Sequence, residues 1–205
     1  MSERVAKVLE QSSMERTIRR LAHEVIERNE KAQTIVLIGI KRRGATLAKR
    51  LAKEITSLSQ KSVDLAFVDI SFYRDDLSYL AADPILNAVE IAFAIEGRDI
   101  VLVDDVLYTG RTARAAIDAI FDQGRPASIR LAVLIDRGHR ELPIRADFVG
   151  KNIPTAKNQH VKVEFLEDDG IEQVTVYTQA EKAAYNSSVK GGNEDELLAE
   201  KCKAL

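Results

Sequence analysis

Apolar runs and amphipathic helical patterns alternate along much of this chain, and this alternation restricts the possible folds most. Residues 34–40 form an almost entirely apolar run, and residues 45–58 have helical spacing after a short polar turn. The same order returns between Asp99 and Gln123, and residues 128–135 form a further apolar run. Strands that alternate with helices predict an α/β fold with a mainly parallel sheet, helices on both faces and ligand sites beyond the carboxyl ends of the strands.

A helix is predicted before the first of these strands. Apolar residues recur at helical spacing between Met14 and Ile26, and Ser12 followed by Glu15 has the spacing of a capping box. Further along the chain, residues 63–70 are predicted to form a second strand, and residues 89–95 are a weaker candidate for another.

The helical period is lost in the part of the chain that follows. Two short segments, residues 161–165 and 174–178, alternate between apolar and polar residues and are predicted to be strands at a sheet edge or in a small hood. Beyond Gln179 the chain is polar and weakly patterned. We therefore expect one domain over residues 1–179, with the hood included, and a flexible polar tail over residues 180–205.

Composition argues against several classes of protein. The chain has 205 residues, a formal net charge of −2, three histidines and one cysteine. The single cysteine, Cys202, can form no intrachain disulfide, and no apolar run reaches the ~20 residues that a membrane-spanning helix needs. So few histidines and cysteines, without close ligand spacing, also argue against a structural zinc site. We expect a cytoplasmic protein with no membrane partner.

The segment Val-Leu-Val-Asp-Asp-Val-Leu-Tyr-Thr-Gly-Arg-Thr, residues 101–112, combines several chemical functions in one turn. Asp104 and Asp105 end a predicted buried strand, where carboxylates can accept hydrogen bonds from ribose hydroxyls or hold a magnesium ion through water. Gly110 lets the backbone approach a phosphate. Hydroxyls, a cation and amide donors at the start of a helix come from the residues around it: Thr109, Arg111 and Thr112.

Simpler interpretations of this segment exist. The paired acids could only solvate a strand end, and Thr-Gly-Arg-Thr could only be a capped turn. The segment is neither a P-loop, which requires Gly-Lys followed by Ser or Thr, nor a Gly-x-Gly-x-x-Gly dinucleotide turn. Paired acids directly before such a turn nevertheless favour an anion-binding site.

The segment resembles the phosphoribosyl pyrophosphate (PRPP) binding motif of type I phosphoribosyltransferases. That family has a mainly parallel sheet flanked by helices, with a small hood over the site. The resemblance implies that Asp104 and Asp105 are catalytic residues that contact the 2′ and 3′ hydroxyls of the ribose. It also implies that the following residues bind substrate and hold its 5′-phosphate: Val106, Leu107, Tyr108, Thr109, Gly110, Arg111 and Thr112.

The position directly before Thr109 bears on the choice of base. Purine-salvage members of the family usually carry an acidic residue there, which serves a ring nitrogen of the purine. This chain has Tyr108 at that position. The resemblance therefore implies a pyrimidine substrate rather than a purine.

Further motifs resemble bacterial regulators of pyrimidine operons that are also uracil phosphoribosyltransferases. The likeness extends over residues 14–178. It is carried by Ala22-His23-Glu24 with Glu27-Arg28-Asn29, by Gly39-Ile40-Lys41, by Tyr73-Arg74-Asp75-Asp76-Leu77, by residues 136–143 and by Gly150-Lys151-Asn152-Ile153-Pro154-Thr155. The implied reaction converts uracil and PRPP into UMP and pyrophosphate with Mg²⁺, which arrives with PRPP near the paired aspartates.

The resemblance also assigns basic residues to this reaction. Lys41, Arg42 and Arg43 would meet pyrophosphate, Arg74 would lie on a loop that closes over it, and Arg137 would lie beside the base. Arg42 departs from the threonine that some members carry. Displacement at the anomeric carbon needs no covalent nucleophile, so we expect catalysis through positioning and through stabilisation of the departing pyrophosphate.

The regulators also bind the leader mRNA of the pyrimidine operon, which implies a basic surface on the first helix and the hood. The matching residues are Arg19, Arg20, His23, His139, Arg140, Arg145, Lys151 and Thr155. Basic side chains can neutralise phosphates, and a histidine can stack on an unpaired base. Arg19 departs from the pattern, where a threonine is usual. The same helix face could instead be only solvated, or could pair with glutamates across a subunit contact in a homo-oligomer.

Three functions remain open from the sequence. The first is a uracil phosphoribosyltransferase that also regulates through RNA. The second is an RNA-binding regulator whose site senses nucleotides with little turnover. The third is a phosphoribosyltransferase without an RNA role. Intact Asp104, Asp105 and Lys41 favour the first.

Overall fold

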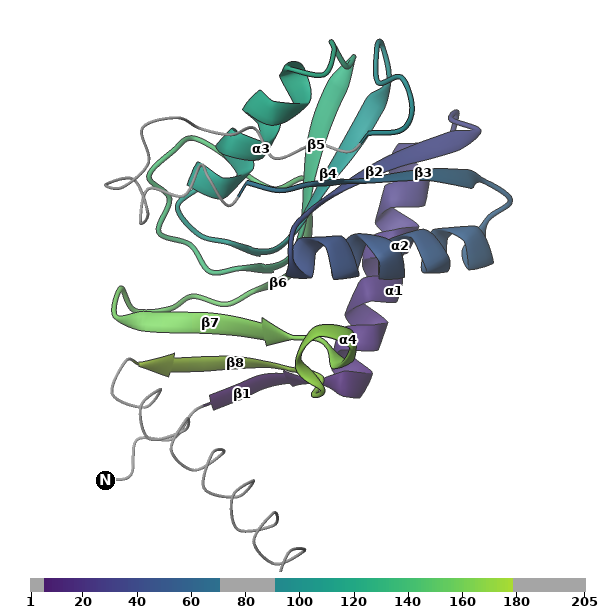
Figure 1. Ribbon diagram of the computed structural model, residues 1–205. Helices are drawn as coiled ribbons and strands as arrows, with labels where there is room; N and C mark the ends of the chain where they lie inside the picture. Colours follow the sequence, from purple (N-terminus) through teal and green to yellow (C-terminus); the bar gives the residue numbers. More distant parts are fainter. Residues whose placement is uncertain (1–5, 71–90, 179–205) are drawn as a thin grey trace, which may run out of the picture.

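The computed structural model describes residues 6–70 and 91–178, and five parallel strands form its main sheet. The strand order is β3-β2-β4-β5-β6, as Figure 1 shows. The strands are β2 (Thr34–Ile40), β3 (Ser62–Val68), β4 (Asp99–Leu107), β5 (Ser128–Asp136) and β6 (Phe148–Asn152). The central strands are apolar along most of their length because both of their faces are covered.

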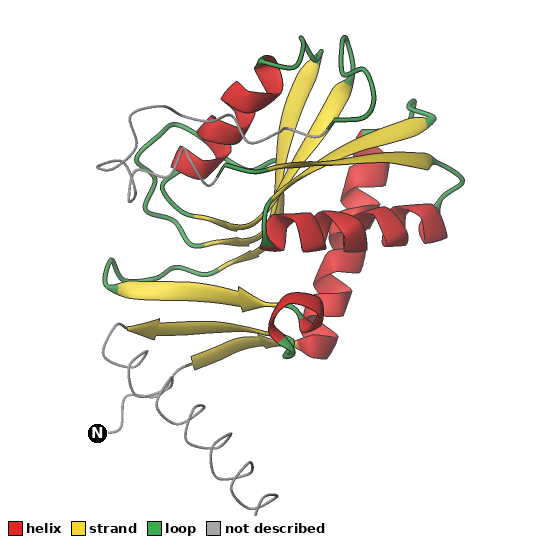
Figure 2. Cartoon of the chain, in the orientation of Figure 1, coloured by secondary structure: helices red, strands yellow, loops and turns green. Residues whose placement is uncertain are grey.

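Three helices cover the two faces of this sheet (Figure 2). They are α1 (Gln11–Arg28), α2 (Arg43–Leu58) and α3 (Arg111–Phe121). Successive strand residues point to opposite faces, so Leu37 packs with α1 and α2 whereas Val36 and Ile38 pack with α3. The predicted α/β class, the mainly parallel sheet and helices on both faces are confirmed.

A second, antiparallel sheet forms the hood below the main sheet in Figure 1. Its strands are β1 (Ala6–Glu10), β7 (Gln159–Glu164) and β8 (Gln173–Thr178), in the order β1-β8-β7, and the short helix α4 (Leu166–Asp169) links β7 to β8. Val163, Phe165 and Val174 join the same core as α1 and α2. The hood therefore shares its apolar core with the main sheet.

The structure corrects several predicted elements. Strands β1 and β6 were missed because both are short and carry polar residues. No strand forms over residues 91–95. The predicted capping box is also absent: α1 begins at Gln11 without a side-chain cap, and Glu15 accepts a hydrogen bond from the Gln11 amide at 3.0 Å instead.

Strand β4 is longer than predicted. Val106 and Leu107 pair with Ile135 and Asp136 of β5, so the strand continues to Leu107 instead of ending at residue 104. The paired aspartates therefore lie within the strand, where pairing with β5 restricts their backbone.

Charged groups join helix α2 to the hood. The Arg43 guanidinium donates to Asp169 at 3.1 and 2.6 Å, and the Arg50 guanidinium contacts both Glu167 and Glu172. The Arg50 side chain is only 20% exposed and that of Glu172 only 5%. The hydrogen bonds that Arg50 donates to Glu172 and Glu167 raise the pKa of Arg50 against the opposing effect of burial. This bridge fixes the hood against the start of α2.

Replacement of Arg50 by methionine is expected to lower the free energy of unfolding by about 2 kcal/mol, because Glu172 would be left buried without its cation. Thermal unfolding followed by circular dichroism measures this loss. The matched control is Arg19→Met on the exposed face of α1, which should change stability by less than about 0.5 kcal/mol. Equal, small effects at both positions would show that the bridge adds nothing.

Among the helices of the described residues, none has the length and the hydropathy of a bilayer span.

Candidate active site

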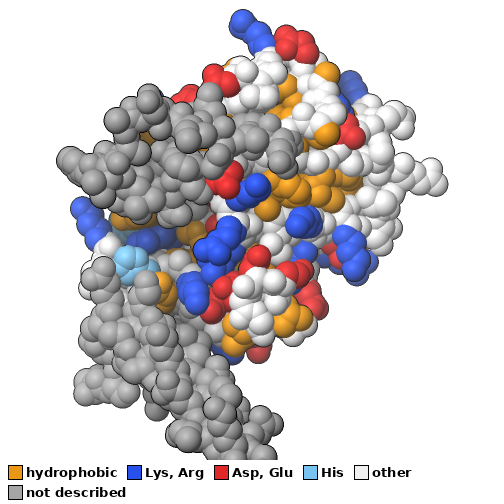
Figure 3. Space-filling model, in the orientation of Figure 1, with side chains coloured by type: hydrophobic (Ala, Val, Ile, Leu, Met, Phe, Trp, Pro, Cys, Tyr) orange, Lys and Arg blue, Asp and Glu red, His pale blue; other side chains and the backbone are white. Residues whose placement is uncertain are grey.

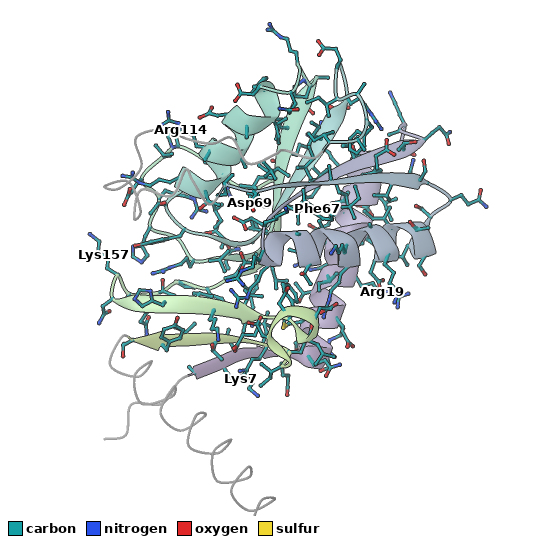
Figure 4. The ribbon with its side chains drawn as sticks, in the orientation of Figure 1. Lys7, Arg19, Phe67, Asp69, Arg114 and Lys157 are labelled. Carbon is teal, nitrogen blue, oxygen red and sulfur yellow. The ribbon has the colours of Figure 1, made fainter. Side chains whose placement is uncertain are left out.

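Three loops that carry predicted site residues follow neighbouring strands at one edge of the main sheet. They follow β2 at Lys41, β4 at Tyr108 and β5 at Arg137, and β4 lies between the other two strands. Asp69, labelled in Figure 4, follows β3 at the same edge and was not identified from the sequence. Carboxyl ends of parallel strands are the usual place for ligands in such sheets.

Asp104 and Asp105 occupy the central position. Asp104 is only 7% exposed, and its carboxylate accepts the Asp105 backbone N–H at 2.9 Å. Burial raises the pKa of Asp105, and the nearby Arg43 charge opposes that rise. Asp104 is buried and Asp105 is half-buried, and both offer carboxylate acceptors, which suits the recognition of hydroxyl groups.

Two glycines let helix α2 approach these strands closely. A Cβ atom on Gly44 would lie 2.7 Å from the Val103 carbonyl oxygen and 3.2 Å from the Asp104 carboxylate. A Cβ atom on Gly39 would lie 2.7 Å from the Ala45 Cα atom. Glycine is therefore required at both positions by the close packing of α2 on β2 and β4.

The turn after β4 has the geometry of an anion site. Gly110 has φ +94°, a conformation that favours glycine, and α3 begins at the next residue. The Arg111 N–H donates to the Thr109 hydroxyl at 3.3 Å, while the Thr109 carbonyl accepts from Glu141 and Leu142. A helix that begins at such a turn presents free N–H groups and the positive end of its dipole to a phosphate.

The loop after β5 lies against this turn. The Arg137 N–H donates to the Leu107 carbonyl at 3.1 Å, and the Arg137 guanidinium lies 3.9 Å from the centre of the Tyr108 ring. Arg137 is only 5% exposed, although no local sequence signal indicated a buried arginine. Burial lowers its pKa. Tyr108 and Arg137, which the sequence placed at the base, do lie together.

The basic residues after β2 differ in their surroundings. Lys41 and Arg42 are exposed, and the peptide bond between them is cis. Arg43 is instead engaged by Asp169 of the hood, and this hydrogen bond is the main influence that raises its pKa. Arg43 thus has a structural partner that the sequence did not reveal. Arg74 lies outside the described residues.

The residues predicted to bind RNA fall into two groups. Arg19, Arg20, His23 and Lys151 are exposed, and Arg20 reaches from α1 to the carbonyls of Val149 and Gly150 in β6. Figure 4 labels Arg19; Figure 3, which looks onto α2 and the hood, shows Lys and Arg side chains across the middle of that face. The others lie on the loops after β5 and β6: His139, Arg140, Arg145 and Thr155.

Most of the second group is bound internally. The Arg140 guanidinium pairs with Asp136 and donates to the Tyr108 carbonyl at 2.8 Å and the Ile144 carbonyl at 2.9 Å. The His139 ring nitrogen lies 2.6 Å from the Thr155 carbonyl oxygen. Asp136 was missed as a site residue because its partner, Arg140, is only recognisable in the folded loop. Arg145 is exposed.

Comparison with known proteins agrees with this geometry. Residues 4–168 match the phosphoribosyl transferase domain family. The bifunctional protein PyrR of Pelotomaculum thermopropionicum is 51% identical over 181 residues, which cover 88% of this chain and 100% of that protein. This chain belongs to the PyrR family. The PyrR protein of Acetivibrio thermocellus is 54% identical over 171 residues, which cover 83% of this chain and 93% of that one.

Solved structures show the same fold for this PyrR chain. A hypoxanthine phosphoribosyl transferase of Trypanosoma cruzi has a TM-score of 0.70 at 20% identity, over 92% of this chain and 98% of that one. A hypoxanthine-guanine phosphoribosyltransferase of Bacillus anthracis has a TM-score of 0.62 at 19% identity, over 87% and 99%. The predictions of a type I phosphoribosyltransferase fold and of membership among the pyrimidine-operon regulators are confirmed. The chain is a phosphoribosyltransferase.

Proposed function

We propose that this PyrR protein transfers the phosphoribosyl group of PRPP to uracil and releases pyrophosphate. The observation that carries the choice of base is the stack of Tyr108 on Arg137 at the edge of the site. An acidic residue there would accept a hydrogen bond from a purine ring nitrogen, whereas a cationic side chain suits the carbonyl oxygens of a pyrimidine.

We assign the parts of PRPP to the three loops, and the strand order supports this assignment. The ribose hydroxyls bind Asp104 and Asp105, and the 5′-phosphate binds the turn from Val106 to Thr112. Pyrophosphate then lies toward the β2 loop, with Lys41 and Arg42, and the base lies toward the β5 loop, with Arg137. The leaving group and the incoming base are on opposite sides of the ribose, as an in-line displacement requires.

Magnesium fits this site as an ion brought by PRPP. Within the described residues there is no group of three or more His, Cys, Asp or Glu side chains that could enclose a metal. Asp104 and Asp105 offer the one or two carboxylates that Mg²⁺ commonly uses beside substrate oxygens and water. When bound, the ion would neutralise charge on the pyrophosphate group. The protein's own residues orient the ribose and keep the reacting atoms in line.

Release of pyrophosphate by the purified protein tests this proposal. With PRPP and magnesium, uracil is expected to give turnover at least about tenfold faster than orotate, hypoxanthine or guanine, because Tyr108 replaces the acid that serves a purine. A faster reaction with hypoxanthine or guanine would contradict the proposed base. Absence of turnover with every base would favour a regulator that only senses nucleotides.

RNA binding is the second proposed function, and the exposed basic residues on α1 and β6 favour it. Arg19, Arg20, His23 and Lys151 are all exposed, and Arg20 joins the helix to the strand. Such a surface can neutralise several phosphates of a leader mRNA of the pyrimidine operon. The internal contacts of Arg140 favour a structural role for that side chain.

Replacement of Arg19 by alanine is expected to weaken binding of a leader transcript and to lower the salt dependence of binding by about one ion, because one phosphate contact is lost. Uracil turnover should be unchanged. Filter binding at several salt concentrations measures the affinity for the transcript and its salt dependence. The matched control is Arg114→Ala, an exposed arginine on α3 across the sheet (Figure 4), which should leave RNA binding unaltered. Equal losses for both variants would contradict the assigned surface.

The remaining expectations stay proposals. We place the transferase and RNA activities in one domain, residues 1–179, and in the cytoplasm, where UMP is used. Residues 180–205 lie outside the described residues. A homo-oligomer would extend the basic surface by repeating it in each subunit.

A further inference from the structure

Among the residues that the structure describes, Arg137 is a buried cation without a counter-ion. Its side chain is bound by neutral groups: the Thr155 hydroxyl lies 3.3 Å from Nε, the Gln159 carbonyl oxygen lies 2.6 Å from Nη2, and the Tyr108 ring covers one face. Within the described residues no carboxylate forms an ion pair with Arg137, although it is only 5% exposed.

The nearest acidic side chain in sequence, Asp136, is already engaged. Its carboxylate pairs with Arg140 and accepts the Gly138 N–H at 2.9 Å. The two further carboxylates of this loop also have other partners: Glu141 pairs with Arg111, and Asp147 accepts the Leu131 N–H at 2.9 Å. The His139 ring is bound to the Thr155 carbonyl. On β4, Asp105 is influenced by the charge of Arg43. No carboxylate of residues 6–70 or 91–178 therefore pairs with the charge of Arg137.

A charge in this state is costly, because burial without an opposite charge forfeits hydration. The lowered pKa of Arg137 reflects the same cost, although a guanidinium remains protonated at neutral pH. Such a cost persists at functional sites where a ligand supplies the missing charge. The Arg137 N–H donates to the Leu107 carbonyl, and its loop follows β5, the side of the turn proposed above for the base. The base is therefore the part of the substrate that we expect to supply the missing charge.

We propose that Arg137 stabilises the anionic form of uracil during transfer. The inference rests on the proposed uracil reaction and goes beyond it by saying how the base becomes a nucleophile. The N1 proton of uracil passes to solvent, the N1 electron pair forms the bond to the anomeric carbon, and the bond from that carbon to the pyrophosphate oxygen breaks with its electrons. Negative charge on the base spreads over both carbonyl oxygens, and the uncompensated guanidinium attracts it.

Uracil analogues with a more acidic ring N–H test this role. In 5-fluorouracil and 6-azauracil the ring N–H is more acidic than in uracil, so these bases depend less on external stabilisation of the anion. Arg137→Gln is expected to lower kcat/KM for uracil about 10²-fold and that for the two acidified bases by about tenfold. Arg137→Lys, which keeps the charge, should retain more activity than Arg137→Gln with uracil. The KM for PRPP should change little in either variant.

The pH profile gives a second readout, first in the wild type and then in the variants. In the wild type, kcat/KM for uracil should reach its plateau at a pH well below the pKa of free uracil, because the enzyme favours the anion. In Arg137→Gln the rise should move to higher pH. Equal losses with all three bases, or a wild-type profile that follows free uracil, would overturn the proposal. If thermal unfolding shows that Arg137→Gln does not fold, the pH profiles of the wild type and of Arg137→Lys test the proposal instead.

Failure of the proposed function would look different. Wild-type protein that releases no pyrophosphate with uracil, 5-fluorouracil or 6-azauracil would refute the uracil reaction and with it this role of Arg137. Turnover of all three bases with no dependence on their acidity would refute only the role of Arg137.

Discussion

Asp105→Asn is expected to lower uracil turnover by about 10²- to 10³-fold while the protein keeps or gains thermal stability. The loss of activity follows from the proposed role of this carboxylate as a charged acceptor for a ribose hydroxyl near the magnesium ion. Asparagine has nearly the same shape, so the strand pairing of β4 with β5 should persist.

The effect on stability follows from the pKa of this group. Burial raises the pKa of Asp105, so the folded state binds its proton more tightly than the unfolded state does. Ionisation at neutral pH therefore costs folding free energy, and this cost grows as the pH rises above the ordinary carboxyl pKa. The neutral asparagine removes that cost.

Steady-state kinetics and thermal unfolding at pH 7 measure both effects. The matched control is Asp122→Asn, an exposed aspartate at the end of α3, which should change neither quantity. Unchanged turnover in Asp105→Asn would remove this carboxylate from the mechanism. A large fall in stability would instead show that the charge stabilises the fold.

Gly44→Ala is expected to reduce both stability and turnover. The added Cβ atom would lie 2.7 Å from the Val103 carbonyl oxygen and 3.0 Å from the Asp104 Cα atom, both of which belong to the backbone of β4. Neither α2 nor β4 can move away without disturbing the parallel sheet, so we expect a loss of about 1–3 kcal/mol in the free energy of unfolding. The same contact would displace Asp104, and a shift of about 1 Å there could cost 10²-fold in turnover.

Gly170→Ala provides the comparison. Gly170 has φ +69° and no atom within 4 Å of an added Cβ, so alanine there meets only the backbone strain of about 1–2 kcal/mol. Both variants should lose stability by urea unfolding, but only Gly44→Ala should lose turnover beyond the change that reduced folding explains. Normal turnover in folded Gly44→Ala would show that the close approach of α2 does not position Asp104.

The sequence alone determined the features that depend on local pattern. The apolar runs at residues 34–40 and 128–135 predicted β2 and β5 closely, because both strands are covered on both faces and so carry apolar residues continuously. The order of acids, glycine and hydroxyls in residues 101–112 likewise predicted a strand, a turn and a helix with an anion site, because each step depends on neighbouring residues.

Only the tertiary structure decided which side chains pair across the fold. Arg43 was predicted to meet pyrophosphate, but it is held by Asp169, 126 positions later in the chain. The burial of Arg137 depends on Tyr108, Thr155 and Gln159, which come from three separate segments. Local sequence indicates which residues are charged. Whether that charge faces an acid, a ligand or solvent depends on which distant segments pack around it.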